Sequence, residues 1–197
     1  EKLDNLYNMG VRLMTLTWNY KNEIGCGALS GYDEGLSQFG KEVVSEMNRL
    51  NMIVDVSHLN EKGFWDVCEK SEKPFIASHS NSFAICPHPR NLKDRQIKAM
   101  AEKNSKIGIN IYPVFVDGEK GRVENIIRHI DHIMNIAGDE SIGIGCDFDG
   151  IGFCPDGIEN ITKVGIIYNE VNRIWGKETA DKVFYDNMYG FFKSVTE

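Results

Sequence analysis

The sequence lacks the cysteine pattern of a disulfide-stapled or zinc-knuckle protein. Its five cysteines are odd in number, and no two of them have the spacing C-x-x-C. A disulfide framework normally uses an even set of cysteines, and a structural zinc site uses closely spaced pairs. We therefore expect small, buried, apolar thiols in a reducing compartment, with a nucleophilic cysteine as the alternative, and we expect a cytoplasmic protein.

Basic clusters and long apolar runs are also missing. The 22 Lys and Arg residues are outnumbered by 29 Asp and Glu residues, which gives a net charge of −7, and no basic run is longer than two residues. Nucleic-acid binding needs a clustered basic face, so we expect no nucleic-acid partner. No stretch approaches the ~18 to 20 apolar residues of a membrane span, and the first ten residues do not resemble a signal peptide.

What the sequence does contain is a regular alternation of strands and helices. Five short apolar runs rich in β-branched residues cover residues 11–18, 52–58, 74–79, 107–112 and 142–147. Near-continuous apolar runs are typical of parallel strands that are buried on both faces. Amphipathic patterns follow them at 36–50, 64–68, 94–101 and 123–134, with Asp94 expected as an N-cap. The tail 164–195 predicts two more helices with a break near Gly176.

This order predicts an α/β fold of right-handed parallel βαβ units. A doubly wound sheet would normally carry a glycine-rich phosphate loop after its first strand. The pairs Gly25/Gly27 and Gly143/Gly145 lack the third glycine and the following helix. Polar residues instead collect where the strands end, which favours a (β/α)₈ barrel of the TIM type, whose active site lies at the carboxyl ends of its strands.

Three of these strand-end residues predict a metal site. His58 and His79 end neighbouring strands, and Asp147 ends the last strand. Two imidazoles at this separation suit a Zn²⁺ ion with a water in its open position, and Asp147 could carry the proton of that water. The alternative for each residue alone is that it caps backbone groups of a turn, but three at equivalent positions favour the site.

Other residues are weaker candidates for the site. Arg90 lies in a proline-stiffened loop and could grip a substrate carboxylate, with a surface salt bridge as an equal alternative. His129 and His132 are spaced i, i+3 and could pair on a metal, but we expect them to face solvent. Trp18 and Tyr112 could line the pocket or pack in the core. The serines near the strand ends lack a G-x-S-x-G motif, which argues against a serine hydrolase.

Four segments closely resemble the renal-type (membrane) dipeptidases, in particular bacterial-type members. They are DVSHLNEKGFWDV, KPFIASHSNSFAICPHPRNLKDRQI, IGINIYPVF and HIDHI…IGIGCDFDGI. The resemblance implies a (β/α)₈ barrel with two zinc ions that cleaves dipeptides by means of a metal-activated water. It also implies that His58 and His79 bind one zinc, that Arg90 holds the substrate carboxylate, that Asp147 is the acid/base, and that Tyr112 lies near the substrate.

The resemblance also indicates what this chain does not contain. The family's first-strand HxD pair and its metal-bridging Glu have no match, and Trp18 stands where mammalian members carry a substrate-contacting His. Only five strands are visible, in the family order four to eight. We therefore expect residues 1–197 to be the C-terminal part of one barrel domain, with a helical tail from about residue 163. Association with the missing segment or with a second copy is expected.

Two rival functions remain open from the sequence. One is another metal-dependent amidohydrolase, such as a lactonase or a deacylase, which would have no use for a carboxylate-gripping Arg90. The other is a non-catalytic half-barrel that retains fold residues without a complete site.

Overall fold

Five parallel strands lie side by side in chain order. The computed structural model describes residues 1–196, and its strands are β1 (Leu13–Thr15), β2 (Ile53–Asp55), β3 (Ile76–Ala77), β4 (Lys106–Ile109) and β5 (Ile142–Ile144). Each strand pairs in parallel with the next, so that Leu13 lies opposite Ile53 and Ile107 opposite Ile142. A doubly wound sheet reverses its order at a switch point, whereas barrel strands follow one another in sequence. The strand order is that of a barrel sector, as predicted.

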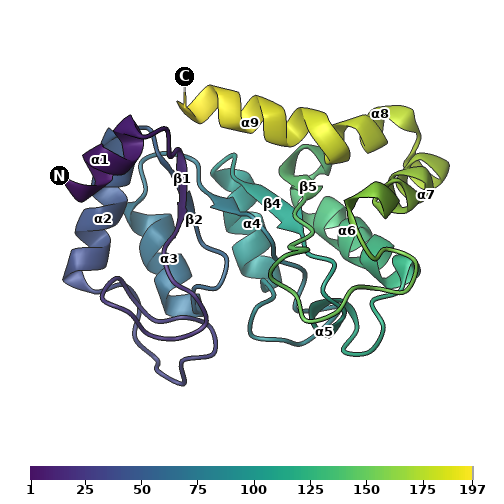
Figure 1. Cartoon of the computed structure of the whole chain (residues 1–197), viewed down its shortest axis with the longest axis horizontal. Coiled ribbons are helices and arrows are strands. Elements are labelled where there is room, and N and C mark those ends of the chain that lie inside the picture. The colour runs from purple at the N-terminus through teal and green to yellow at the C-terminus, as the bar shows by residue number, and fades with distance from the viewer. Residues whose placement is uncertain (197) are drawn as a thin grey trace.

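Helices connect the strands and form the tail (Figure 1). They are α1 (Lys2–Asn8), α2 (Gln38–Arg49), α3 (Glu61–Lys70), α4 (Asp94–Glu102), α5 (Pro113–Val116), α6 (Val123–Ala137), α7 (Gly165–Trp175), α8 (Lys177–Asp181) and α9 (Asn187–Thr196). Shorter turns are η1 (Asp139–Ser141), η2 (Ile161–Lys163) and the π-helical η3 (Lys182–Asp186). Within residues 1–196, no helix combines the length and the apolarity that a bilayer crossing requires.

Side-chain caps determine where several helices begin. Ser37 and Asn60 each accept a hydrogen bond from the backbone N–H three residues further on, at the starts of α2 and α3. Both are residue types that satisfy the free N–H groups of a first turn. The prediction of Asp94 as an N-cap was wrong by one residue: Lys93 is the cap, and its N–H donates to the side chain of Gln96 at 2.9 Å.

The main hydrophobic core lies between the sheet and its helices. Its fully buried members include Met47 of α2, Phe64 of α3, Met100 of α4 and Ile130 of α6. Each such side chain contributes about 1.5 to 3 kcal/mol on leaving water. These residues occupy the apolar stripes read from the sequence, which explains why the helical patterns were predicted correctly.

The opposite face of the sheet is covered at one end only. Phe191 and Val195 of α9 form a separate cluster with Ile53 and Ile76, the first residues of β2 and β3. Figure 1 shows α9, in yellow, running across this end of the sheet. Because side chains alternate along a strand, Asp55 shares the face of Ile53 but lies at the other, carboxyl end. That end of the face carries polar side chains.

The tail contains the break predicted near Gly176. Helix α7 ends at Trp175, and Gly176 follows with φ +90°, a left-handed conformation that glycine adopts without a Cβ clash. The helix that then starts at Lys177 runs through α8, η3 and α9 to Thr196.

Candidate metal and substrate site

The predicted site residues gather at the carboxyl ends of the strands. His58 follows β2, His79 follows β3, Tyr112 follows β4 and Asp147 follows β5, while Arg90 lies in the loop between β3 and α4. The strands end two or three residues earlier than the apolar runs suggested, so all five side chains belong to the loops. This is the location that the barrel interpretation requires.

His58 and His79 point toward one another with their Nε2 atoms. The two Nε2 atoms are 2.9 Å apart, and the ring centroids are separated by 4.9 Å. Both rings line a cavity of about 340 Å³ whose other walls are Thr15, Leu16, Thr17, Trp18 and Asn22. The structure therefore brings the two predicted ligands together in an accessible hollow.

Each ring has a second partner on its far nitrogen. Nδ1 of His58 lies 2.8 Å from Oδ1 of Asn19, and Nδ1 of His79 lies 2.7 Å from Oγ of Ser78. With an amide oxygen as its partner, Nδ1 of His58 is the donor. Its Nε2 then presents a lone pair to the cavity, as a metal-ligating imidazole does. Asn19 was missed in the sequence, since nothing distinguishes it from other loop asparagines.

Both imidazoles are held neutral. Burial, together with the nearby positive charge of Arg90, lowers the pKa of His58 to about 3. Burial also lowers the pKa of His79, although Asp55 and Asp147 act in the opposite direction. A neutral imidazole is the form that binds a metal ion.

The backbone is strained at two of the site residues. His58 has φ +72° and Asp147 has φ +64°, a left-handed conformation that costs free energy for residues with a Cβ. Among residues 1–196, the other two non-glycine residues with a positive φ are Asn51 and Asn104, a residue type that adopts this conformation more readily. At His58 and Asp147 the left-handed turn sets the direction of a side chain of the candidate site.

Arg90 carries a buried guanidinium with donors that no described residue satisfies. Its side chain is only 3 % exposed, and its Nε and Nη2 find no hydrogen-bond partner among residues 1–196. Burial lowers its pKa to about 10, while the carboxylates of Asp55 and Asp147 raise it. The surface salt bridge that we considered for Arg90 is not formed within the described residues.

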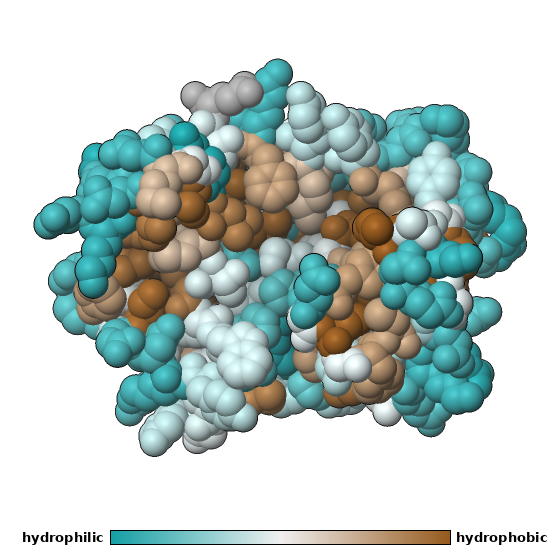
Figure 2. Space-filling view, in the orientation of Figure 1, coloured by the Kyte–Doolittle hydropathy of each residue, from teal (hydrophilic) through white to brown (hydrophobic). Residues whose placement is uncertain are grey.

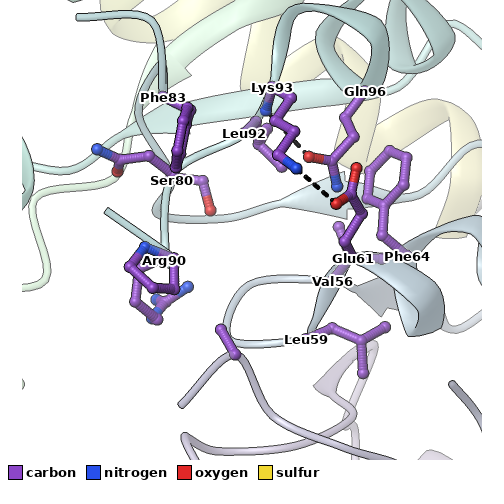
Figure 3. A pocket seen from close by; sticks show the side chains of 13 residues that line it. Val56, Leu59, Glu61, Phe64, Ser80, Phe83, Arg90, Leu92, Lys93 and Gln96 are labelled. Atoms are coloured by element: carbon purple, nitrogen blue, oxygen red, sulfur yellow. Dashed lines mark hydrogen bonds and ion pairs between the residues drawn. The ribbon is translucent and has the colours of Figure 1, made fainter. Parts of the chain in front are cut away.

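A second cavity lies beside Arg90 (Figure 3). Its volume is about 260 Å³, and apolar side chains of Val56, Leu59, Phe64, Phe83 and Leu92 form much of its wall. A buried cation with free donors in such surroundings is costly unless an anion accepts from it. The arrangement therefore favours a carboxylate or similar group as the missing acceptor.

Asn110 links the two remaining predicted residues. Its Nδ2 donates to Oδ2 of Asp147 at 3.3 Å, and its Oδ1 accepts from the N–H of Tyr112 at 2.6 Å. The Tyr112 ring packs edge-on against Phe115 and Phe153, at 5.0 and 5.4 Å between centroids. Asn110 was missed in the sequence, although a polar residue inside the run IGINIY was a usable signal.

The histidine pair on α6 is not a metal site. His129 is completely buried, which contradicts the expectation that it faces solvent. Its Nδ1 accepts from the N–H of Ser82 at 3.1 Å, and its Nε2 donates to the carbonyl of Val116 at 2.8 Å. His132 pairs instead with Asp94 at 2.8 Å.

Of the remaining candidates, Trp18 lies at the cavity that holds His58 and His79, whereas the five cysteines do not. Trp18 is 67 % exposed and lies 6.4 Å from the His58 ring, so it lines the cavity and does not pack in the core. The five cysteines are free thiols; Cys26 and Cys86 are buried, and the others are partly buried. None of them joins His58 and His79.

The metal-binding set is short of ligands. Among the residues that the structure describes, no group of three or more His, Cys, Asp or Glu side chains is placed to hold one ion. A catalytic zinc usually has three protein ligands and an open position. His58 and His79 alone therefore fall short of such a ligand set.

Known proteins resemble this chain over its whole length. A family model described as membrane dipeptidase (peptidase family M19) matches residues 1–197. The chain belongs to this family. Among curated relatives, it is 33 % identical to an uncharacterized protein in the pqqA 5′ region of Klebsiella pneumoniae, over 98 % of this chain and 75 % of that protein.

Other relatives are longer than this chain. An uncharacterized dipeptidase of Schizosaccharomyces pombe is 37 % identical over 82 % of this chain, but that match spans only 41 % of the yeast protein. The crystal structure of a metallo peptidase from Rhodobacter sphaeroides, liganded with a phosphinate mimic of the dipeptide L-Ala-D-Ala, superposes with a TM-score of 0.92 at 31 % identity. The superposition covers 99 % of this chain and 59 % of the Rhodobacter chain. The structural match agrees with a partial TIM-type barrel.

Proposed function

We propose that the protein is a zinc-dependent dipeptidase. The observation that carries the proposal is the convergence of two neutral imidazoles, whose Nε2 atoms lie 2.9 Å apart at the carboxyl ends of neighbouring barrel strands. Membership of a metallopeptidase family supports it. When bound, zinc would activate a water molecule and polarise the peptide carbonyl.

His58 and His79 would be ligands of one of the two zinc ions implied by the family resemblance. Their fit is supported by the Nδ1 partners Asn19 and Ser78, which keep each Nε2 turned to the cavity. The set falls short of a closed site, so further ligands have to come from the HxD pair and the bridging Glu of the family pattern. Those residues would belong to the strands that this chain does not contain.

Arg90 would bind the C-terminal carboxylate of the dipeptide. A planar guanidinium can donate two parallel hydrogen bonds to a carboxylate, and Nε and Nη2 are buried donors for which residues 1–196 supply no acceptor. Such an ion pair would satisfy both donors in a cavity that Glu61 and Lys93 also line. A lactone or an acylated amine without a carboxylate would leave them unpaired, which favours a dipeptide over these substrates.

Asp147 would move the proton during hydrolysis. The attacking water must lose a proton and the leaving amine must gain one, and a carboxylate close to both can do this work. Asn110 orients Asp147 through the hydrogen bond to Oδ2, and the left-handed turn at Asp147 aims the side chain. Tyr112, fixed by Phe115 and Phe153, would form part of the substrate wall.

We further propose that residues 1–197 supply strands four to eight of the barrel. In the described residues, β1 and β5 each have one strand neighbour. Figure 2 shows apolar side chains at the surface on both sides of the strand region. Three further strands, or a second copy of the chain, would cover this apolar surface and pair with the two edges. The free thiols agree with a reducing, cytoplasmic location.

A direct test uses the purified full-length protein, prepared without metal. Hydrolysis of L-Ala-D-Ala should depend on added Zn²⁺, and the same dipeptide amidated at its C-terminus should be cleaved far more slowly. Equal cleavage of both would contradict the assignment of Arg90 to the carboxylate. Absence of zinc-dependent cleavage across a panel of dipeptides would contradict the proposed function.

A further inference from the structure

Asp55 is a buried carboxylate that the proposed reaction does not use. It ends β2 and has an exposed fraction of 0 %. It accepts four hydrogen bonds, all from neutral donors: Oγ1 of Thr15 at 2.7 Å, the N–H of Ser57 at 3.0 Å, and both the N–H and Oγ of Ser78, at 3.0 and 2.6 Å. Burying a carboxylate is expensive even with such donors, so its position calls for an explanation.

The explanation lies in the direction of the hydrogen bonds that pass through Ser78. A hydroxyl has one proton to donate, and an ionised carboxylate can only accept. Oγ of Ser78 is 2.6 Å from Oδ2 of Asp55 and 3.4 Å from Oγ of Ser57, so its proton goes to Asp55. Its lone pairs are then left for Nδ1 of His79 at 2.7 Å, and Nδ1 must be the donor.

We propose that Asp55 is a positioning residue that acts through Ser78 to hold His79 in the tautomer with its proton on Nδ1. In that tautomer Nε2 carries a lone pair and lies 2.9 Å from Nε2 of His58. Because His58 also has its proton on Nδ1, two lone pairs face each other with no hydrogen bond between the rings, and a cation between them would remove this repulsion. The other tautomer would point an N–H bond at the place of the ion and block ligation. The tautomer itself does not depend on the proposed function, whereas its consequence for zinc binding rests on it.

Asp55, Ser78 and His79 form a hydrogen-bond relay, and the direction of its bonds depends on one atom of Asp55, Oδ2. Oδ1 accepts both backbone N–H groups, from Ser57 and Ser78, while Oδ2 faces the two hydroxyls of Thr15 and Ser78. In Asp55→Asn, the amide oxygen has to take the Oδ1 position, because an NH₂ group there would meet two N–H donors. The NH₂ group then donates to Ser78, whose proton turns to Nδ1 of His79 and forces the N–H onto Nε2.

The tautomer can be read directly from ¹⁵N–¹H correlations of the imidazoles in metal-free, full-length protein. We expect His79 to be protonated at Nδ1 in the wild type and at Nε2 in Asp55→Asn. Ser78→Ala removes the acceptor and should leave a mixture of tautomers. Thr15→Val is the matched control, because it removes the other hydroxyl bond to Oδ2 of Asp55 and leaves the bond from Ser78 in place, and it should keep the wild-type tautomer.

Zinc titration of the same proteins measures how the tautomer of His79 affects metal affinity. Loss of an outer hydrogen-bond partner typically weakens metal affinity about 10- to 100-fold, and we expect this for Asp55→Asn and Ser78→Ala but not for Thr15→Val. A wild-type His79 protonated at Nε2, or a pure Nδ1 tautomer in Ser78→Ala, would overturn the proposal. If Asp55→Asn does not fold, the tautomer of His79 in Ser78→Ala tests the proposal by itself. The expected tautomers together with no zinc binding by the wild type would retain the relay and overturn the proposed function.

Discussion

Nε2 of His58 and Nε2 of His79 face each other at 2.9 Å, with the second nitrogen of each ring engaged elsewhere. Two nitrogens bound to one tetrahedral zinc at 2.0–2.1 Å are separated by about 3.3 Å. The rings thus need to part by only a few tenths of an ångström to admit an ion. In this sense the pair is preorganised for a shared cation.

The first prediction concerns metal retention. His58→Ala and His79→Ala should each lose bound zinc, because one imidazole is a poor site, while the helical content by circular dichroism stays nearly unchanged. Metal per chain is measured by atomic absorption after dialysis. His132→Ala is the control, since His132 belongs to a surface pair with Asp94. Unchanged zinc in both ligand variants would remove these histidines from the site.

The second prediction concerns proton transfer. In the full-length enzyme, Asp147→Asn should retain zinc and bind substrate but lose about 10²- to 10⁴-fold in kcat, the usual contribution of general acid–base catalysis. Asp149→Asn is the matched control, because Asp149 is exposed two residues away. Steady-state kinetics on a dipeptide measures both variants, and a near-normal kcat for Asp147→Asn would exclude it from this role.

The third prediction concerns the substrate carboxylate. Arg90→Lys should mainly raise KM for dipeptides, since a point charge replaces a planar pair of donors. The comparison is with Arg95→Lys, an exposed arginine that pairs with Glu61. Substrates amidated at the C-terminus should be insensitive to the Arg90 change. An equal rise in KM for free and amidated dipeptides would argue against a carboxylate contact.

The sequence was sufficient to predict the helices and strands and to place the candidate site residues after the carboxyl ends of the strands. Periodicity locates buried runs and amphipathic helices, and His58, His79 and Asp147 follow buried strands whose carboxyl ends meet at one edge. Asn19 and Asn110 were not predictable in this way. Their roles arise only when loops from different strands come within hydrogen-bond distance, and no local pattern encodes that distance.

The burial of His129 also depends on hydrogen-bond partners that lie far along the chain, and the prediction that it faces solvent was wrong for this reason. It borders the apolar stripe of α6, so periodicity alone could not decide whether its ring faced water. The ring is buried because the loop after β3 offers an N–H group and α5 offers a carbonyl, and both ring nitrogens are satisfied. A polar side chain can be buried wherever distant backbone groups complete its hydrogen bonds.

The fourth prediction follows from this burial. Desolvation lowers the pKa of His129 to about 4 in the folded protein, against an ordinary value of 6.5. Between these values the unfolded chain binds a proton that the folded chain does not, so stability is complete above about pH 6.5 and declines as the pH falls toward 4. The loss amounts to about 3 kcal/mol, from 1.36 kcal/mol per pKa unit.

The measurement is urea unfolding across pH 4.5 to 7.5 for the wild type and His129→Gln. Glutamine keeps an amide donor for the Val116 carbonyl but cannot titrate, so its unfolding free energy should vary less with pH. Other titrating groups cancel in the difference between the two proteins. Identical pH dependence would mean that His129 does not carry this share of the acid sensitivity.

The last prediction concerns residues 1–197 on their own. Within the described residues, β1 and β5 each pair with one strand only, and α9 covers only one end of the face of the sheet that lies opposite the main core. Two histidines also leave a zinc short of its usual ligands. We therefore expect the isolated segment to bind at most one metal ion weakly and to hydrolyse dipeptides negligibly, and we expect it to associate through its open edges. Analytical ultracentrifugation, zinc titration and a dipeptide panel test this together. Full turnover by a monodisperse monomer of 22.3 kDa would overturn the prediction, because some carboxylate within residues 1–197 would then have to complete the site.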